Sequence, residues 1–537
     1  MAELNTSVLY YGDNLDVLRK HIPDESVDLI YLDPPFNSNR SYNVLFREST
    51  GAASEAQIEA FEDTWKWGPI AALAYEEVVT GPHQQVARML KAMVEGLGRN
   101  DVTAYLSMMA PRLVELHRVL KATGSMYLHC DPTASHYLKA LLDAIFGPSN
   151  FRNEIVWKRT TIHRDAKRFG RVADYLLYYS KTDSFTWQTQ FSGHQEDYVS
   201  SHYTYADTDG RRYRLDNATA AGQGPPRYYD GKLLEPPPGT HWRWSQENID
   251  KLIREGRIAF TRTGRPSYKR YLDEMAGTPV PSIWDDIPPV NSQAKERLGY
   301  PTQKPLALLE RIISASSNPG DIVLDPFCGC GTAVHAAHKL GRRWIGIDVT
   351  YLAINLIERR MRDAFPGITI EVEGDPKDLA SAQDLARRDK WQFQWWALAK
   401  LNAQPVAGKK KGADRGIDGV IPYFAGPKED YRRAIVSVKG GEHVTVSMVR
   451  DLVGVLEREK EPLGVLLTLE PPTQPMTTEA AAAGFYHSEF WQKDYPRVQI
   501  ITVEDMLNGK RPELPSTRSP FAQAPLEKEE AKQGGLM

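Results

Sequence analysis

The 537-residue chain is longer than one hydrophobic core usually organises, so we expect two or three domains. Hydrophobic residues make up 41% and charged residues 25%, which excludes wholesale disorder, and the net charge of −3 excludes a strong overall positive field, so contacts with nucleic acid would need local basic patches. The three cysteines exclude a disulfide scaffold, and a sequence without a signal peptide or long apolar run favours a cytoplasmic protein.

The order of the predicted elements indicates an α/β protein with a mostly parallel sheet. Strand-like apolar runs near 9–11, 27–32 and 125–129 alternate with helical stretches, and the same rhythm resumes at 321–325 and 343–348. We predict six segments, namely an α/β domain in two halves (1–184 and 291–370), an insert rich in Tyr, Trp, Arg, Pro and Gly (185–290), a polar linker (371–390), a smaller α/β domain (391–511) and a disordered tail (512–537).

The tetrapeptide Asp33-Pro34-Pro35-Phe36 directly follows the run 27–32, at a carboxyl-terminal strand edge where α/β enzymes bind ligands. Proline has no N–H to donate, so this turn offers acceptors. The exocyclic amino nitrogen of a base is a poor nucleophile because its lone pair is delocalised into the ring. The Asp33 carboxylate and the Pro34 carbonyl would accept both amino hydrogens and free that lone pair for methylation. Phe36 would stack on a flipped base; a structural strand terminator is the alternative.

A basic cluster follows the expected strand 153–157 and is interrupted by one acid, Asp165. Its members are Lys158, Arg159, Arg164, Lys167, Arg168 and Arg171. Clustered positive charge suits contact with DNA phosphates, whereas a solvated surface face is the alternative. We expect bases to be read by the insert 185–290, whose basic residues among many Tyr and Trp include Arg211, Arg212, Arg214, Arg262, Arg265, Lys269 and Arg270.

The loop Asp325-Pro326-Phe327-Cys328-Gly329-Cys330-Gly331-Thr332 joins an expected buried strand to an expected helix. In such a unit, small residues let the backbone approach a nucleotide-like ligand. The next strand ends at Asp348, whose carboxylate could accept hydrogen bonds from ribose hydroxyls. The loop is short and lacks a third glycine, so a methionine-linked nucleoside fits better than a dinucleotide. A purely structural turn is the alternative, and the two cysteines make a poor zinc site without further ligands.

Together the two motifs resemble the permuted (β-class) DNA amino-methyltransferases over residues 1–365, including the modification subunits of type III restriction systems. In that family the catalytic tetrapeptide precedes the target-recognition insert and the cofactor loop comes last, which is the order found here. The resemblance implies a Rossmann-like methyltransferase domain that binds S-adenosylmethionine. It implies cofactor contacts from Asp13, Thr302, Lys304, Asp325, Pro326, Phe327, Gly329, Gly331, Thr332 and Asp348. Among these, Asp13 would lie near the cofactor adenine, and the segment 302–305 would close over the methionine portion.

An aspartate at position 33 resembles the adenine-modifying members, so we expect methylation of the N6 amino group of adenine in duplex DNA, with N4 of cytosine as the alternative. Many relatives carry glutamate where this chain has Asp348; either residue can hold a ribose. The resemblance also implies a role in restriction–modification or phage defence. Homodimers are common in the family, and an additional restriction subunit is a possible partner.

In the smaller domain, Asp418 and Lys439 stand near the ends of two expected strands, where they could hold a divalent ion and position water for attack on a phosphodiester. This region resembles Mrr-type nucleases of the PD-(D/E)xK superfamily, which implies a restriction-endonuclease-like fold with Asp418 as a Mg²⁺ ligand. Ser437 stands where an acid or glutamine normally supports the metal, and a neutral hydroxyl is a weaker ligand. Glu442 or Gln394 could take its place.

Three alternatives remain open at this stage. One is a modification enzyme whose C-terminal domain binds DNA or a partner without cutting, which the serine at position 437 favours. Another is a methyltransferase that acts on RNA or protein, although the large aromatic and basic insert weighs against it. The third is a DNA-binding protein without enzyme activity, against which the presence of both halves of a methyl-transfer site argues.

Overall fold

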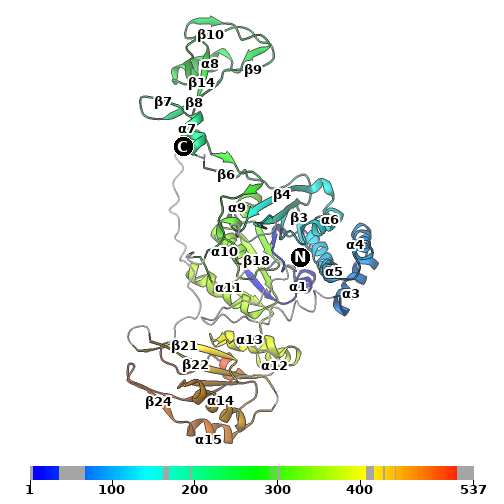
Figure 1. Cartoon of the computed structure of the whole chain (residues 1–537), viewed down its shortest axis with the longest axis vertical. Helices are drawn as coiled ribbons and strands as arrows, with labels where there is room; N and C mark the ends of the chain where they lie inside the picture. The colour runs from blue at the N-terminus through cyan, green and yellow to red at the C-terminus, as the bar shows by residue number, and fades with distance from the viewer. Residues whose placement is uncertain are drawn as a thin grey trace. The chain divides into compact units, whose positions relative to one another are not determined.

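The computed structural model describes residues 4–35, 67–160, 169–193, 196–291, 294, 296–298, 303–406, 416–426, 430–441 and 443–516. Two compact units are found, one formed by Thr189–Pro281 and the other by Met1–Gln188 together with Ser282–Met537 (Figure 1). The first of these lies inside the segment 185–290 that we predicted as an insert. No helix within the described ranges is long and apolar enough to cross a membrane.

A nine-stranded mixed sheet is the centre of the larger unit. Its order is β16 (Ile283–Trp284), β4 (Phe151–Lys158), β5 (Ala173–Ser180), β3 (Leu120–Cys130), β2 (Val27–Leu32), β17 (Ile322–Asp325), β18 (Arg343–Asp348), β1 (Val8–Tyr11) and β19 (Glu371–Glu373). The six strands from β3 to β19 are parallel neighbours, whereas β5 runs antiparallel to β3 and β4. The continuous apolar runs of β2 and β17 fit central parallel strands, which are covered on both faces.

The pairing of β2 with β17 joins the two predicted halves of the α/β domain, 1–184 and 291–370, in one sheet. Leu29 lies opposite Val323, and Ile30 lies opposite Leu324. Because the strands are parallel, their carboxyl ends meet at the same edge, so the segment that begins at Asp33 lies beside the loop after β17.

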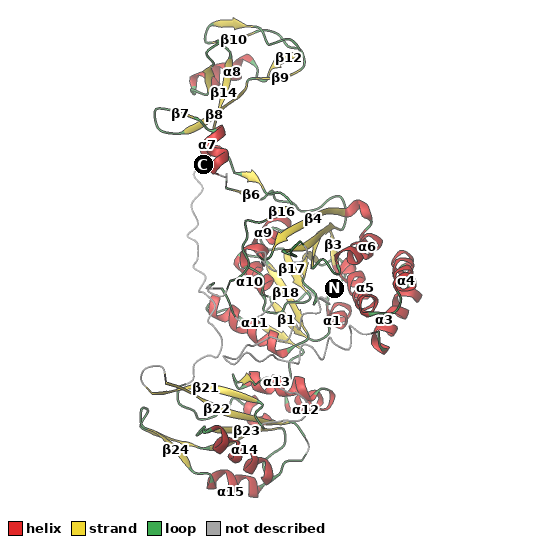
Figure 2. Cartoon of the chain, in the orientation of Figure 1, coloured by secondary structure: helices red, strands yellow, loops and turns green. Residues whose placement is uncertain are grey.

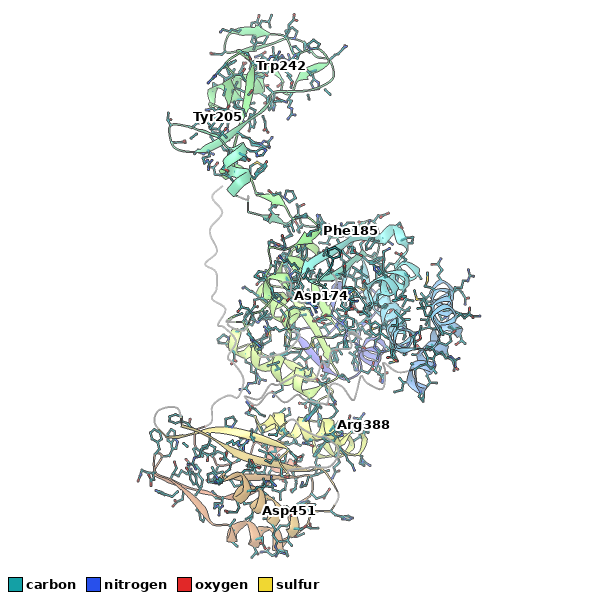
Figure 3. All side chains as sticks on the ribbon, in the orientation of Figure 1. Asp174, Phe185, Tyr205, Trp242, Arg388 and Asp451 are labelled. Atoms are coloured by element: carbon teal, nitrogen blue, oxygen red, sulfur yellow. The ribbon has the colours of Figure 1, made fainter. Side chains whose placement is uncertain are left out.

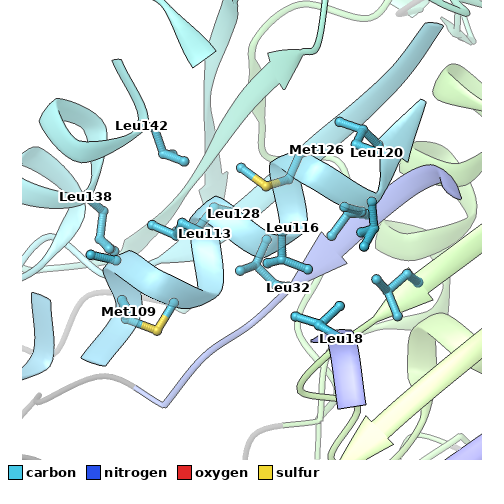
Figure 4. Packing of buried hydrophobic residues seen from close by; sticks show 14 of the residues in the cluster. Leu18, Leu32, Met109, Leu113, Leu116, Leu120, Met126, Leu128, Leu138 and Leu142 are labelled. Atoms are coloured by element: carbon cyan, nitrogen blue, oxygen red, sulfur yellow. The ribbon is translucent and has the colours of Figure 1, made fainter. Parts of the chain in front are cut away.

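Helices cover the sheet on both sides, as Figure 2 shows for α5 and α6 on one side and α9, α10 and α11 on the other. Their bounds are α1 (Asn14–His21), α3 (Pro69–Thr80), α4 (Gln84–Leu97), α5 (Asp101–Val119), α6 (Ser135–Phe146), α9 (Leu306–Ser316), α10 (Thr332–Lys339) and α11 (Tyr351–Ala364). Helix α5 buries Met109, Leu113 and Leu116, a helical spacing that presents one apolar stripe to Leu32 and Leu128 of the sheet (Figure 4). Each such side chain contributes about 1.5–3 kcal/mol by burial.

The unit Thr189–Pro281 is built from short strands. Its elements are β6 (Phe191–Ser192), α7 (Glu196–His202), β7 (Tyr205–Ala206), β8 (Arg212–Asn217), β9 (Thr219–Ala221), β10 (Arg227–Tyr229), β11 (Lys232–Leu234), β12 (Thr240–Trp242), α8 (Gln246–Arg254), β13 (Ile258–Phe260), β14 (Pro266–Tyr271) and β15 (Thr278–Pro279). A four-stranded antiparallel sheet has the order β13-β14-β8-β7. A small apolar cluster contains Ala218, Tyr229, Trp242 and Ile249.

The C-terminal part contains a second, five-stranded sheet. Its elements are α12 (Leu379–Arg388), α13 (Lys390–Lys400), β20 (Gln404–Pro405), β21 (Gly419–Gly426), β22 (Asp430–Lys439), α14 (Val446–Glu459), β23 (Gly464–Thr468), α15 (Gln474–Ala482), β24 (Phe485–Ser488), β25 (Lys493–Pro496), β26 (Val498–Thr502) and α16 (Val503–Leu507). The order is β20-β21-β22-β23-β26, in which the first three strands are antiparallel and the last three parallel. Tyr351 of α11 is buried in the apolar cluster of this sheet.

Two segments that we predicted to lack structure are partly folded. The polar segment 371–390 contains β19, which pairs with β1, and helix α12, which begins with a capping box at Asp378. This segment is polar because it contains an edge strand and exposed helix faces, and a linker has a similarly polar composition. At the start of the predicted tail, the Glu513 N–H donates to Gln499 (2.8 Å) and the Ser516 carbonyl accepts from the Phe424 N–H (2.8 Å). Residues 517–537 lie outside the described residues.

Candidate active site

Four aspartates lie where strands of the large sheet end. Asp33 follows β2, Asp325 and Asp348 are the last residues of β17 and β18, and Asp13 follows β1 and caps helix α1 by accepting from the Leu15 N–H (2.7 Å). Because these strands are parallel, the four carboxylates belong to a single edge of the sheet. The sequence-predicted residues on both motifs are thereby brought together.

The Asp33 carboxylate forms an ion pair with the Lys304 ammonium, and both side chains are largely buried. The partners are 271 residues apart in the sequence, so this contact joins the tetrapeptide to the segment ahead of α9. Gln303 fixes that segment, because its side chain accepts from the Leu298 N–H (2.9 Å) and donates to the Glu296 carbonyl (2.5 Å). The resemblance had assigned Lys304 to the cofactor; the structure places it on the carboxylate predicted to hold the base.

The cofactor loop depends on two glycines with positive φ. Gly329 has a φ of 49° and Gly331 one of 72°, and a Cβ on Gly331 would approach the Ile357 side chain to 2.8 Å. The Cys328 N–H donates to the Ile347 carbonyl (3.1 Å), which fixes the loop against β18. Cys328 and Cys330 are buried in the loop, and within the described residues no group of three or more His, Cys, Asp or Glu side chains could hold a metal.

Asp348 is buried, and its orientation is fixed by three donors. One oxygen accepts from the Gly329 N–H (2.9 Å), and the other accepts from the N–H (2.9 Å) and hydroxyl (2.8 Å) of Thr350. Burial raises the pKa of Asp348 to about 6 despite these hydrogen bonds. Burial, together with repulsion from Asp33 and Asp348, also raises the pKa of Asp325 well above its ordinary value, against the opposing hydrogen bond from the Phe327 N–H. This edge of the sheet is therefore an acidic, partly desolvated site.

Arg360 of α11, a residue that the sequence analysis missed, supports the cofactor loop. The buried guanidinium donates to the Cys330 carbonyl (3.0 Å), the Thr332 hydroxyl (3.0 Å) and the His335 ring (3.2 Å). A signal for it exists in the sequence, because Arg360 interrupts the helical stripe of buried residues that includes Ile357 and Ala364.

A second network that the sequence did not reveal connects Asp13 to the loop. Arg112 of α5 donates to Asp13 (2.7 Å) and to Asn14 (2.7 Å), and Asn14 in turn donates to the Pro326 carbonyl (2.9 Å). The side chain of Asp13 nevertheless remains half-exposed, so it is free to contact a ligand. Arg112 thus connects the end of β1, at Asp13, with the end of β17, at Pro326, through Asn14.

A third network is a buried chain of side chains beside the tetrapeptide. The Tyr31 hydroxyl lies 3.0 Å from Nδ1 of His129, and Nε2 of His129 lies 3.2 Å from Asp174, which Figure 3 labels. A carboxylate only accepts, so Asp174 accepts from Nε2–H, and with a neutral imidazole Nδ1 then accepts from the Tyr31 hydroxyl. Burial and the nearby Asp33 raise the pKa of Tyr31. Although burial acts to raise the pKa of Asp174, the hydrogen bond from His129 and the charges of Lys304 and Arg159 hold it below the ordinary value.

The basic cluster is described only in part. Lys158 and Arg171 are exposed on the neighbouring ends of β4 and β5, whereas the Arg159 guanidinium lies 3.4 Å from the buried Asp174. These three cations therefore gather at one end of the β4–β5 hairpin, and their contact with DNA stays a prediction. The sequence-predicted residues that lie outside the described residues are Phe36, Arg164, Lys167, Arg168 and Thr302.

In the C-terminal sheet, Asp418 precedes β21 and contacts β22. Its carboxylate accepts hydrogen bonds from Gln394 of α13 (2.9 Å), the Val438 N–H (2.7 Å) and the Ser437 hydroxyl (3.2 Å). Lys439 is the last residue of β22, and its carbonyl accepts from the Leu469 N–H. Three neutral donors thus already engage the predicted metal ligand. Glu442 lies outside the described residues.

The comparisons with known proteins concern the larger α/β part. A family model described as DNA methylase matches residues 27–359. The type II methyltransferase M.EcaI of Enterobacter cloacae is 29% identical over 359 residues, which cover 66% of this chain and 69% of that protein. The DNA adenine methyltransferase YhdJ of Escherichia coli is 27% identical over 355 residues, which cover 66% and 82%.

A third relative is a subunit of a larger system. The Mod subunit of the type III restriction-modification enzyme StyLTI of Salmonella typhimurium is 27% identical over 347 residues, which cover 61% of this chain. The matched region spans 49% of that relative, about half its length. All three matches cover about two thirds of this chain or less.

Proposed function

The chain belongs to the DNA methylase family, and on that premise we propose that it transfers the methyl group of S-adenosylmethionine to the N6 amino group of adenine in duplex DNA. The observation that carries the proposal is the shared sheet edge of Asp33 and the glycine loop at 325–332. N4 of cytosine is the competing target, because the same acceptors would hold its amino group. The name of the adenine-specific relative YhdJ supports adenine.

The residues at 33–35 provide the acceptors that the amino group requires. The Asp33 carboxylate and the Pro34 carbonyl accept the two amino hydrogens, which frees the nitrogen lone pair for the new N–C bond as the S–C bond of the donor breaks. The methylated nitrogen would then release one proton, which the Asp33 carboxylate would take up from its hydrogen bond. The Lys304 ammonium contacts one oxygen of the Asp33 carboxylate, and the other oxygen is left to accept from the base.

The residues at the ends of β17 and β18 suit the methyl donor. Asp348 is held by N–H and O–H donors that leave lone pairs for ribose hydroxyls, and the glycines at 329 and 331 let the backbone approach a nucleoside. When bound, the cofactor would supply the electrophilic methyl group.

DNA contact is proposed for the basic end of the β4–β5 hairpin, where Lys158 and Arg171 are exposed. Such contacts make affinity fall as salt rises. The type III Mod subunit among the relatives supports a restriction-modification or phage-defence role in the cytoplasm, with a separate restriction subunit as the partner. A homodimer is the other assembly expected from the resemblance.

For the C-terminal domain we propose a PD-(D/E)xK-like fold, which the strand order and the positions of Asp418 and Lys439 support. A Mg²⁺ ion at Asp418 would have to displace donors from Gln394, Ser437 and the Val438 N–H. This engagement favours a second candidate function, a modification enzyme whose C-terminal domain binds DNA without cutting. Incubation of methylated and unmethylated DNA with the protein and Mg²⁺ tests it; cleavage that Asp418→Ala abolishes would overturn the modification-only role.

Expression in a methylation-free host, followed by single-molecule sequencing of the DNA, tests the main proposal. We expect N6-methyladenine at one recognition sequence. Asp33→Ala should abolish methylation while calorimetric binding of S-adenosylmethionine is retained, whereas Asp16→Ala, an exposed carboxylate on α1, should leave both unchanged. Detection of N4-methylcytosine would show that cytosine is the target base. Full activity of Asp33→Ala would show that Asp33 is not the acceptor of the amino hydrogens.

A further inference from the structure

Five cationic side chains on or beside the sheet of the unit Thr189–Pro281 are held by carboxylates, whereas Arg212 of β8 donates to the Tyr203 carbonyl (3.2 Å). The pairs are Arg211–Asp273 (2.8 Å), Arg211–Glu274 (2.9 Å), Arg214–Asp216 (3.0 Å), Arg257–Glu274 (2.5 Å), Lys269–Asp207 (2.6 Å) and Arg270–Asp216 (2.5 Å). Five cations face four carboxylates, so the sheet presents little net positive charge. Arg211 and Arg257 also lie over the Tyr271 ring, at 4.0 and 4.9 Å from its centroid. These ion pairs therefore cross-link the strands, and four of the cations in them (Arg211, Arg214, Lys269 and Arg270) are among the insert residues named in the sequence analysis.

The turn between β13 and β14 carries arginines that are not held by any carboxylate of the described residues. Arg262 and Arg265 are both exposed on it, and no ion pair within the described residues involves either side chain. Phe260, at the end of β13, is 42% exposed beside them. Two unpaired arginines and an aromatic side chain thus stand together at the tip of one hairpin.

The backbone of this turn is held by hydrogen bonds within the turn. The Thr261 N–H donates to the Arg265 carbonyl (2.8 Å), the Gly264 N–H donates to the Thr261 carbonyl (2.8 Å), and the Thr261 hydroxyl accepts from the Arg265 N–H (3.1 Å). Gly264 adopts the left-handed conformation that the turn needs, with a φ of 75°. A turn that is already ordered loses little conformational entropy when it binds.

We propose that this hairpin, residues 260–265, enters the major groove of the substrate DNA, and that Arg262 and Arg265 read guanine there. A two-stranded ribbon fits the major groove, and arginine donates two parallel hydrogen bonds to O6 and N7 of guanine. Phe260 is placed for apolar contact with a neighbouring base, such as a thymine methyl group. The inference rests on the proposed DNA methylation and predicts that the recognition sequence contains guanine.

The test compares the methylated sequences of variants in the methylation-free host. Arg262→Ala and Arg265→Ala should each relax the sequence at a guanine, with discrimination against the other bases at that position reduced by about 5- to 150-fold, the range for one bidentate contact. Arg254→Ala removes an exposed arginine of α8 in the same unit and should leave the sequence unchanged. Arg211→Ala removes a paired arginine and should lower the melting temperature without altering the sequence.

Three outcomes would overturn the proposal. One is an unchanged recognition sequence in both hairpin variants. Another is a uniform loss of affinity on all sequences with a shallower salt dependence, which is the signature of phosphate contact. The third is relaxed specificity in Arg254→Ala as well, which would mean that any cation of the unit contributes. A wild-type protein that methylates no DNA would instead refute the proposed function, so the two failures are distinguishable.

Discussion

Asp348 predicts how cofactor affinity depends on pH. Burial raises its pKa to about 6, so the carboxylate is mostly charged at pH 7 and mostly protonated at pH 5. Ribose hydroxyls donate hydrogen bonds, which favour the charged form. If only that form binds, the dissociation constant of S-adenosylmethionine should rise about tenfold from pH 7 to pH 5, one pKa unit below the midpoint.

The stability of the cofactor-free protein should change in the opposite direction. Because the folded-state pKa of Asp348 lies above its ordinary value of 3.8, its contribution to stability is fully present below pH 3.8 and is lost as pH rises through about 6. The charged carboxylate then costs about 3 kcal/mol at pH 7, the equivalent of a pKa rise of about two units. A bound cofactor would offset this cost.

Isothermal titration calorimetry between pH 5 and 7 at constant ionic strength measures the effect. Asp348→Asn should bind weakly throughout, because one amide oxygen cannot satisfy the donors of both Gly329 and Thr350, and its affinity should not vary in this range. Asp325→Asn is the second control, since the pKa of Asp325 is also raised. Equal affinity of the wild type at pH 5 and 7, or an unchanged pH dependence in Asp348→Asn, would refute the reasoning.

Three substitutions test the supports of the site. Gly331→Ala should cost about 1–3 kcal/mol in urea unfolding, because the new Cβ meets Ile357 at a positive φ; an unchanged midpoint would contradict this. Arg360→Met leaves the Cys330 carbonyl without its donor and should cost about 1–3 kcal/mol, with weaker cofactor binding in calorimetry. Asp174→Asn removes a charged hydrogen-bond partner of His129 and should lower the methylation rate about tenfold with cofactor affinity unchanged; equal losses of both would indicate a general structural role.

The family could be predicted from the sequence, and the match to the DNA methylase model confirms it. The two motifs follow apolar strands, and the carboxyl ends of parallel strands share an edge, so Asp33 and Asp348 were identifiable. That β2 is the neighbour of β17 was not available from the strands themselves; it followed from the resemblance to permuted relatives. The roles of the individual site residues stay predictions.

The supporting polar residues could not be predicted, for a physical reason. Arg112, His129 and Asp174 act through partners that are distant in sequence, and a buried polar residue is explained only when its partner is known. The charge pattern was equally ambiguous in the insert, where Arg211 and Arg262 look alike in sequence. The difference is that Arg211 pairs with the carboxylates of Asp273 and Glu274, whereas Arg262 lies on the exposed turn.

The position of β1 and β2 in the sheet has a consequence for synthesis on the ribosome. Strand β2 emerges early, but its neighbour β17 begins about 290 residues later, which at 5–20 residues per second is a delay of about 15–60 s. During that interval the backbone N–H and C=O groups on one edge of the apolar strand β2 have no partner strand. Strand β1 likewise has no partner until β18 and β19 have been synthesised. A chain that ends before β17 lacks the glycine loop at 325–332 and Asp348, so the site is assembled only after these segments have been synthesised.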